Sequence, residues 1–125
     1  MIDSELFIQE AKDCGFTTYA GVPCSFLKSF INYINDSSEI NYIPAANEGD
    51  AIAIAAGVYL GGEYSVVMLQ NSGLGNAINP ITSLLQTFDI PVLIVVTLRG
   101  DPSASLDEPQ HRLMGEITTD LLDLM

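Results

Sequence analysis

Glu48 is the residue whose type and position most clearly suggest chemistry in this sequence. It stands where a short apolar run, Ile40 to Ile43, leads through Asn47 into a second apolar run, Ala51 to Leu60. An acid in the first turn of a helix is stabilised by unpaired backbone N–H groups, by about 0.3–1 kcal/mol, and this interpretation needs no function. The alternative is that a partner or cofactor buries Glu48 and favours its protonated form, which would share a proton with a ligand nitrogen.

Positively charged side chains are scarce, and this limits the ligands that the chain can bind. Four Lys and Arg residues stand against sixteen Asp and Glu residues, which gives a formal net charge of −12 at pH 7. Such a charge repels phosphate backbones and anionic lipid surfaces, so we expect no nucleic-acid or membrane partner. An anionic substrate would have to be held by Arg99, Arg112 or the single histidine, His111, because Lys28 is predicted to face solvent.

The length and the cysteines indicate the general class of protein. A chain of 125 residues predicts one domain that buries about two-thirds of its unfolded surface. Cys14 and Cys24 fit no metal-ligand or redox spacing, which predicts reduced thiols in a cytoplasmic protein. The longest apolar runs, Ala51 to Leu60 and Ile90 to Leu98, are shorter than the roughly 20 residues that cross a bilayer.

Helical and strand-like patterns alternate along the chain, which is typical of an α/β layer fold. Strands are predicted at 17–22, 40–43, 65–69 and 91–97, and helices at 4–14, from about 25 to 34, at 48–60, within 77–88 and after 115. The start of the fourth helix is open between Gly73–Asn76 and Pro80, and Arg99–Gly115 is predicted to be a polar loop. The helix at 48–60 is apolar on nearly every side, so we expect it between layers or beneath a partner.

The predicted strands are parallel, and their carboxyl ends should form one ligand-binding edge of the sheet. Four loops rich in unusual residues belong to this edge: 21–25, 47–48, 70–76 and 99–100. Gly73-Leu74-Gly75 is not a dinucleotide loop, because Ile78 stands at the third glycine position. No Ser-His-Asp order, Walker sequence or metal-ligand cluster occurs, so we expect no autonomous catalytic set and no metal ligands in this chain.

Three segments resemble the pyrimidine-binding domain of thiamine-diphosphate-dependent 2-oxoacid decarboxylases. They are Gly21-Val22-Pro23-Cys24-Ser25, Ala46-Asn47-Glu48 with the helix that follows, and Gln70-Asn71-Ser72-Gly73-Leu74-Gly75-Asn76. The resemblance covers nearly the whole chain and implies a three-layer, doubly wound, mostly parallel sheet with helices on both faces. It identifies residues 1–125 as a pyrimidine-binding domain, and we expect one or two strands of that domain to lie outside these residues.

Further segments of the sequence suggest the substrate. Arg99-Gly100-Asp101-Pro102, Asp107–His111 and Gly115–Thr118 resemble the members of this family that act on 3-phosphonopyruvate. The implied function is a lyase of phosphonate biosynthesis that forms phosphonoacetaldehyde and CO₂. The first alternative keeps this chemistry with sulfopyruvate as the acid. An alternative of another class is a non-catalytic α/β interaction module whose apolar helix and glycine loop dock a partner.

The resemblance also implies roles for individual residues. Glu48 would bond the pyrimidine ring of the cofactor and share a proton with it, which makes it the first catalytic candidate. The other residues implied at the cofactor are Pro23, Cys24, Gln70, Asn71 and Gly73. Substrate contacts are implied for Ser25, Asn71, Arg99, His111 and Arg112, and His111 is the second catalytic candidate. Ordinary turn chemistry for the loop residues and a surface position for His111 remain the alternatives.

The resemblance further implies that this chain needs a partner. In this family the diphosphate and Mg²⁺ of the cofactor are held by a separate domain with a Gly-Asp-Gly motif. No segment here matches that motif, because Gly49-Asp50 is followed by Ala51 and Gly100-Asp101 by Pro102. We therefore expect one subunit of a hetero-oligomer, α2β2 or larger, whose diphosphate-binding partner completes the active site.

Overall fold

The computed structural model of the protein describes residues 2–104 and 107–125. Its strands are β1 (Phe16–Gly21), β2 (Asn41–Pro44), β3 (Tyr64–Gln70) and β4 (Leu93–Thr97), and its α-helices are α1 (Ser4–Asp13), α2 (Lys28–Asp36), α3 (Glu48–Leu60), α4 (Leu74–Pro80) and α5 (Arg112–Leu124). Shorter helical segments are η1 (Ser25–Leu27), η2 (Asn71–Gly73), the π-helical η3 (Ile81–Leu85) and η4 (Pro109–His111). All strand pairs are parallel, in the order β2-β1-β3-β4.

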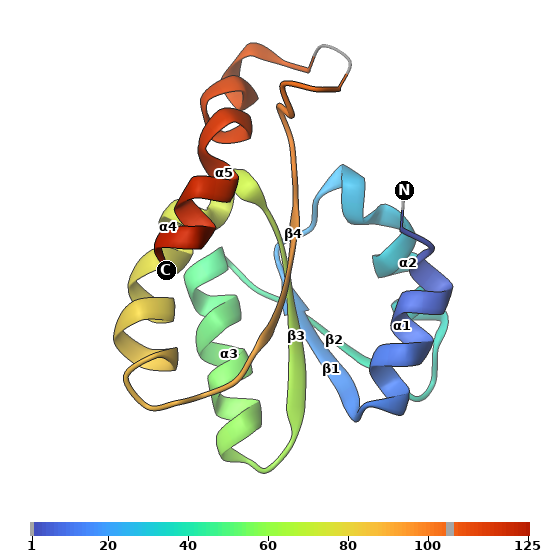
Figure 1. The fold of residues 1–125 in the computed structure, drawn as a ribbon. Coiled ribbons are helices and arrows are strands. Elements are labelled where there is room, and N and C mark those ends of the chain that lie inside the picture. Colours follow the sequence, from blue (N-terminus) through green and yellow to red (C-terminus); the bar gives the residue numbers. More distant parts are fainter. Residues whose placement is uncertain (1, 105–106) are drawn as a thin grey trace.

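Helices cover both faces of the sheet, as predicted (Figure 1). Helices α1 and α2 lie on one face, and α3, α4 and α5 lie on the other. The central strand β3 serves both layers because its side chains alternate: Val66 and Met68 join the core beneath α1 and α2, whereas Val67 and Leu69 join the core beneath α3 and α4. A continuous apolar run therefore marks a strand that is covered on both sides.

The predicted starts of the first and third helices agree with the capping geometry. The Asp3 carboxylate accepts a hydrogen bond from the Leu6 N–H at 3.0 Å at the start of α1, and Gly15 follows that helix with φ +93°. Helix α3 has the predicted bounds, and its N-cap is the Asn47 side chain, which accepts from the Asp50 N–H at 3.1 Å. The cap frees the neighbouring Glu48 for another contact.

The fourth helix begins at its earlier alternative. Helix α4 opens at Leu74, directly after η2, and Pro80 is its last residue rather than part of its first turn. Proline has no N–H and crowds the preceding turn, so the hydrogen-bond pattern changes there. The helix continues as the π-helical η3, in which the Gln86 N–H donates to the Ile81 carbonyl at 2.9 Å.

The loop predicted at Arg99–Gly115 ends earlier in the structure than predicted. Helix α5 begins at Arg112, so Gly115 lies inside a helix instead of closing a loop. A Cβ at residue 115 would lie 1.8 Å from the Gly100 carbonyl oxygen, which means that α5 touches the backbone of the strand-end loop. Gly115 is thus required for close packing, a role that cannot be distinguished from a helix stop in the sequence.

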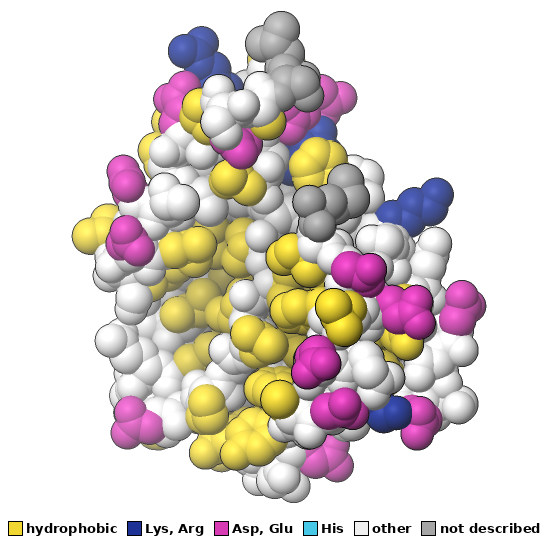
Figure 2. Space-filling view, turned by 45° about the vertical axis from the view of Figure 1, so that its right-hand side comes forward, with side chains coloured by type: hydrophobic (Ala, Val, Ile, Leu, Met, Phe, Trp, Pro, Cys, Tyr) yellow, Lys and Arg dark blue, Asp and Glu magenta, His cyan; other side chains and the backbone are white. Residues whose placement is uncertain are grey.

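Strand β4 forms one edge of the sheet and is less covered than β3. Residues 65–69 of β3 are all buried, whereas Leu93 of β4 is 37% exposed and the other β4 residues are only partly buried. Figure 2 shows hydrophobic side chains gathered on the face that carries this edge. Within the described residues, no helix combines the length and apolar character needed to cross a lipid bilayer.

Candidate active site

The structure brings the four predicted loops together at the carboxyl ends of the strands. At the last residues of the strands, Gly21 is aligned with Pro44 of β2 and with Met68 of β3, and Gln70 of β3 is aligned with Thr97 of β4. Side chains of the following loops then make hydrogen bonds across this edge, and they fall into four groups: around Glu48, around Asn71, along the row of Cys24, Gln70 and Thr97, and around Arg99.

Glu48 is half-buried at the start of α3 and points to the glycine loop after β3. Its Oε2 accepts a hydrogen bond from the Asn76 side-chain amide at 2.8 Å. Its carboxyl group also lies against Gly73, where a Cβ would come within 2.2 Å of the Glu48 Cδ. The side chain that caps α3 is Asn47, so Glu48 is directed across the edge of the sheet toward two residues of the predicted cofactor loop.

Asn71 is fully buried and holds the second group together. Its Nδ2 donates to the Arg99 carbonyl at 2.9 Å and to the Thr118 hydroxyl at 3.0 Å, and its Oδ1 accepts from the Arg99 N–H at 3.2 Å. The amide therefore joins the end of β3 to the end of β4 and to α5. Asn71 is predicted to contact cofactor and substrate, but its donor and its acceptor are used within the protein.

Cys24, Gln70 and Thr97 form a row of polar side chains along the ends of β1, β3 and β4. The Cys24 thiol donates to Gln70 Oε1 at 3.2 Å and lies 3.7 Å from the Thr97 hydroxyl. Gln70 Nε2 donates to the Ser72 hydroxyl at 2.7 Å. Pro23 is exposed next to this row. These groups border the glycine loop, where the sequence predicts the cofactor.

Arg99 forms the centre of the fourth group. Its Nε and one terminal nitrogen donate to the two oxygens of Asp107 at 2.7 and 2.6 Å, and the other terminal nitrogen donates to the Ser25 hydroxyl at 3.3 Å. The guanidinium also lies 4.6 Å from the centre of the Phe26 ring. The Arg99 guanidinium holds the pKa of the Asp107 carboxyl well below its usual range.

Asp107 is the main site residue that the sequence does not identify. It is eight positions after Arg99 in a turn-rich segment that is predicted to be neither helix nor strand, so no period relates the two residues. Arg99 is predicted to bind the substrate anion, but two of its nitrogens are already paired with Asp107. Its third nitrogen donates to the hydroxyl of Ser25, which is also a predicted substrate residue, so this is the nitrogen nearest to the predicted substrate.

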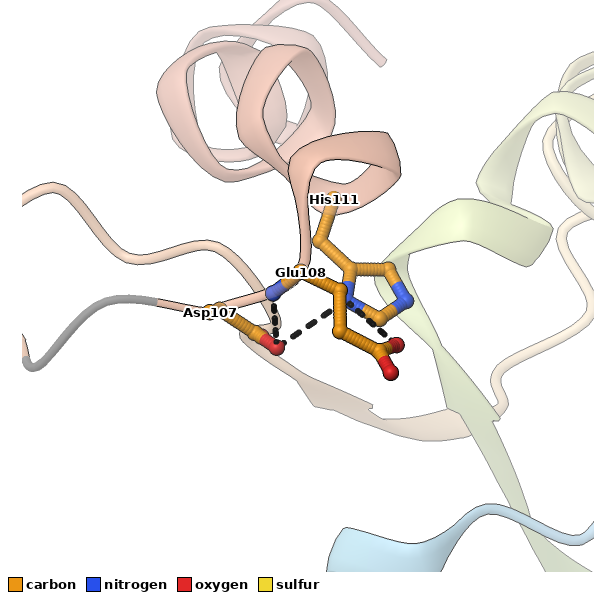
Figure 3. Close-up of side chains that lie close together, drawn as sticks. All are labelled: Asp107, Glu108 and His111. Carbon is orange, nitrogen blue, oxygen red and sulfur yellow. Dashed lines mark hydrogen bonds and ion pairs between the residues drawn. The ribbon is translucent and has the colours of Figure 1, made fainter.

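His111 is buried, and its ring lies beside two acidic side chains (Figure 3). Its Nδ1 is 3.1 Å from Asp107 Oδ1 and 3.9 Å from Glu108 Oε2. The ligand atoms of these three residues lie within 4.8 Å of one another, a spacing that could hold a metal ion. The positive charge of this cluster is the Arg99 guanidinium, 2.6 Å from Asp107 and 3.8 Å from Glu108, so we assign no metal here.

Arg112 and Lys28 lie at the surface. The Arg112 side chain is 83% exposed, and its Nε donates to Glu116 at 3.1 Å. A hollow of about 450 Å³ lies beside Arg112, but it is lined by more acidic than basic side chains and does not include Glu48 or Asn76. We therefore place the candidate site at the strand ends, where the predicted residues meet, and not in this hollow.

Comparisons with known proteins identify the family. The family described as thiamine pyrophosphate enzyme, N-terminal TPP binding domain, matches residues 3–123. Phosphonopyruvate decarboxylase of Streptomyces viridochromogenes is 52% identical over 110 residues, which are 88% of this chain and 28% of that protein. Phosphonopyruvate decarboxylase of Streptomyces hygroscopicus is 45% identical over 124 residues, 99% of this chain and 31% of that protein. The chain thus spans about three tenths of these two relatives, 28% and 31% of their lengths.

A shorter relative and one solved structure agree with this family, and a second solved structure shares the fold. Sulfopyruvate decarboxylase subunit alpha of Methanococcus maripaludis is 39% identical over 96% of this chain and 71% of that protein. Benzoylformate decarboxylase from Polynucleobacter necessarius has a TM-score of 0.67 at 26% identity and matches 77% of this chain and 18% of that one. The Rhodococcus jostii RHA1 thiamine diphosphate-dependent 4-hydroxybenzoylformate decarboxylase has a TM-score of 0.68 at 22% identity and matches 90% of this chain and 22% of that one. The chain belongs to the thiamine pyrophosphate enzymes, as their N-terminal TPP-binding domain.

Proposed function

We propose that this chain is the pyrimidine-binding part of a thiamine-diphosphate-dependent decarboxylase that converts 3-phosphonopyruvate into phosphonoacetaldehyde and CO₂. The observation that carries the proposal is the position of Glu48, whose carboxyl group lies against Gly73 at the ligand edge of the sheet. Identities of 52% and 45% to two phosphonopyruvate decarboxylases support the choice of substrate.

The residues around Glu48 fit a flat heterocycle. Oε2 is held by Asn76, and Oε1 has no hydrogen-bond partner within residues 2–104 and 107–125. The Glu48 carboxyl itself fills the space that a side chain at Gly73 would take, and this fixes the position of that oxygen. Glu48 would hold a proton at Oε1 and share it with a ring nitrogen, while Cys24, Gln70 and Pro23 border the ring. Thiamine diphosphate, when bound, supplies the stabilisation of a carbanion that decarboxylation of a 2-oxoacid requires.

The substrate would lie between this group and the group around Arg99. His111 is the candidate for holding or moving a proton, and the Arg99 nitrogen beside Ser25 is the candidate for the anionic end of the acid. Arg112 can reach toward the same anion only by leaving Glu116, since its side chain lies at the surface. Asn71 holds the two loops in place through the Arg99 backbone.

A separate domain or subunit would bind the rest of the cofactor. The apolar helix α3 supports such a partner, because Leu60 is 74% exposed and Ala53 and Gly57 are exposed on the same helix. We propose that a diphosphate-binding partner with a Gly-Asp-Gly motif covers Glu48 and holds Mg²⁺, in a cytoplasmic hetero-oligomer. That three relatives are named as alpha subunits supports a split enzyme.

We also propose that one or two further strands of the domain pair with the free edge of β4. Helix α3 connects β2 to β3 and helix α4 connects β3 to β4, both on the same face of the sheet. Each connection leads to a strand nearer the β4 edge. Helix α5 lies on that face too, so a right-handed crossover that continues from it would place the next strand beside β4. The partly exposed apolar side chains of β4 support this position.

Sulfopyruvate is the second candidate substrate. It is favoured by the sulfopyruvate decarboxylase alpha subunit of Methanococcus maripaludis, of which this chain spans 71%. Turnover of phosphonopyruvate, sulfopyruvate and pyruvate, compared in the same reconstituted enzyme, separates the two candidates. Faster turnover of sulfopyruvate would replace the first proposal by the second.

The test of the proposed function is Glu48→Gln in the complex with the diphosphate-binding partner. We expect the loss of thiamine-dependent CO₂ release with unchanged assembly, because the amide keeps the shape of Glu48 but cannot share a proton in the same way. Glu63→Gln, an exposed change beyond the other end of α3, is the matched control and should retain turnover. A Glu48→Gln enzyme with the turnover of the unchanged enzyme would favour the non-catalytic interaction module instead.

A further inference from the structure

We propose that Asp107 is a positioning residue for His111, which it holds with Nδ1 protonated so that Nε2 is the nitrogen available to a substrate. The inference rests on the proposed function, in which His111 belongs to the active site. It assigns a role to an acid that lies in a segment carrying the family resemblance, Asp107–His111, but that receives no role from it.

The orientation of the Asp107 carboxylate is fixed by N–H donors on both of its oxygens. Oδ2 accepts from Arg99 Nε at 2.7 Å and from the Gly100 N–H at 2.9 Å. Oδ1 accepts from the second Arg99 nitrogen at 2.6 Å and from the Glu108 N–H at 2.7 Å. A carboxylate held in this way acts only as an acceptor. His111 Nδ1, 3.1 Å from Oδ1, must therefore donate its proton to that bond.

The backbone around His111 is also fixed. Gly100 has φ +74°, and a Cβ there would lie 2.2 Å from the His111 carbonyl oxygen. Gly100 is also in close contact with Gly115 of α5. The His111 side chain is only 11% exposed, so the ring has little freedom to turn. Figure 3 shows the second ring nitrogen on the side of the ring that faces away from Asp107.

The consequence concerns which nitrogen can act as a base. The hydrogen bond made by one ring nitrogen decides which nitrogen of a neutral histidine carries the proton. With Nδ1 donating to Asp107, Nε2 has a free lone pair and can accept a proton or a hydrogen bond. Glu108 cannot replace Asp107 in this role, because its Oε2 is 3.9 Å from Nδ1 and its side chain is 64% exposed.

The sequence permits a direct test, because His111 is its single histidine. A chain labelled with nitrogen-15 histidine gives one pair of ring nitrogens in a long-range proton–nitrogen correlation spectrum. For the neutral ring we expect a protonated Nδ1 and a bare Nε2. In Asp107→Asn the new amide can donate to Nδ1, so we expect the proton to move to Nε2. Glu108→Gln is the matched control and should keep the spectrum of the unchanged chain.

Two results of this experiment would overturn the inference. One is a neutral ring with Nε2 protonated in the unchanged chain, which decides the question even if Asp107→Asn does not fold. The other is the same spectral change in Glu108→Gln as in Asp107→Asn. Circular dichroism of each variant shows whether the secondary structure of the chain is retained.

Kinetics of the reconstituted enzyme separate this inference from the proposed function. Asp107→Asn should lower kcat by roughly 10- to 100-fold, because it removes the contact that orients His111. A change in KM would instead report on Arg99, the proposed substrate contact, which the same substitution releases from a charged partner. Glu108→Gln should retain both constants. An unchanged kcat for Asp107→Asn, with turnover abolished in Glu48→Gln, would overturn the inference and leave the proposed function in place. Full turnover of Glu48→Gln together with the expected histidine spectrum would overturn only the proposed function.

Discussion

The carboxyl group of Glu48 lies directly against the backbone of Gly73, so the acid and the glycine each depend on the other. A Cβ at residue 73 would come within 2.2 Å of the Glu48 Cδ and 2.3 Å of its Oε1. Gly73 has a φ of −80°, which any residue can adopt, so the need for glycine at this position is steric. This steric need explains why the residue that faces the Glu48 carboxyl is a glycine.

Gly73→Ala should therefore displace the Glu48 carboxylate without unfolding the protein. A methyl group at residue 73 removes the space in which the acid lies, and a misplacement of about 1 Å at a reacting group lowers the rate by about 100-fold. We expect a loss of this order in kcat for CO₂ release by the reconstituted enzyme. The thermal unfolding midpoint of the chain should change little, because the half-buried Glu48 side chain can move.

Gly75→Ala is the matched control for this experiment. Gly75 lies two residues further on, in the first turn of α4, and a Cβ there would meet no atom within 4 Å. We expect its turnover to equal that of the unchanged enzyme. If Gly73→Ala and Gly75→Ala had the same kcat, the contact between Glu48 and Gly73 would have no role in turnover.

Asn71→Ala should destabilise the protein as a whole. The substitution leaves the Arg99 N–H and carbonyl and the Thr118 hydroxyl without their buried partner. An unpaired buried polar group costs about 1–3 kcal/mol, so we expect a decrease of about 3 kcal/mol in the free energy of unfolding. Urea unfolding of the chain measures this value. Asn32→Ala, an exposed change in α2, should stay within about 0.5 kcal/mol, and equal stability of the two variants would contradict the prediction.

The order and approximate bounds of the helices and strands could be predicted, because each helix or strand depends on residues that are close in sequence. The bounds of α3 follow from an Asn cap, a run of alanines and isoleucines and two closing glycines. The ligand edge follows from the parallel order of the strands. Glu48 could be identified because it is a lone acid between two apolar runs, and the glycine loop because its glycines stand after a strand.

The contacts that arrange the site could not be predicted, because they join residues without a regular separation. Asn71 bonds to Arg99, 28 positions away, and to Thr118, 47 positions away. Asp107 meets Arg99 across a turn-rich segment that is predicted to be neither helix nor strand, so no period relates the two residues. A polar residue of this kind looks the same in sequence whether it binds a ligand or a backbone.

Tyr19→Phe should change the alkaline stability of the protein. Tyr19 is fully buried, its hydroxyl has no hydrogen-bond partner in the part of the chain that the structure describes, and burial raises its pKa from 10.0 to about 12. Below pH 10 the hydroxyl is neutral in both states. Between pH 10 and about 12 it ionises only in the unfolded chain, which lowers the free energy of unfolding by roughly 2–3 kcal/mol at the upper end.

Urea unfolding at about pH 8 and about pH 11 measures this effect without a second variant. At the lower pH, Tyr19→Phe should be more stable than the unchanged chain by about 1 kcal/mol, because it removes an unpaired buried hydroxyl. At the higher pH its advantage should grow, since the phenylalanine cannot ionise. An advantage of the same size at both pH values would show that the folded and unfolded states bind the Tyr19 proton equally.

Gly115→Ala should separate α5 from the strand-end loop. The added Cβ would lie 1.8 Å from the Gly100 carbonyl oxygen and 2.7 Å from its Cα, and a backbone cannot move aside as a flexible side chain can. We expect the free energy of unfolding to fall by about 1–3 kcal/mol, although alanine is the better helix former. In the labelled chain, the His111 signals should also shift, because the His111 backbone lies against Gly100.

Gly57→Ala tests the same substitution where nothing opposes it. Gly57 is exposed within α3, and a Cβ there would meet no atom within 4 Å. Alanine should then stabilise the isolated chain by about 1 kcal/mol through its higher helix propensity. Both substitutions replace glycine by alanine within a helix, so they share the gain in helix propensity. A fall in the free energy of unfolding for Gly115→Ala and a rise for Gly57→Ala would therefore isolate the steric effect at Gly115. If Gly115→Ala were as stabilising as Gly57→Ala, α5 would not press on the Gly100 backbone, and His111 would have to be held in place by Asp107 alone.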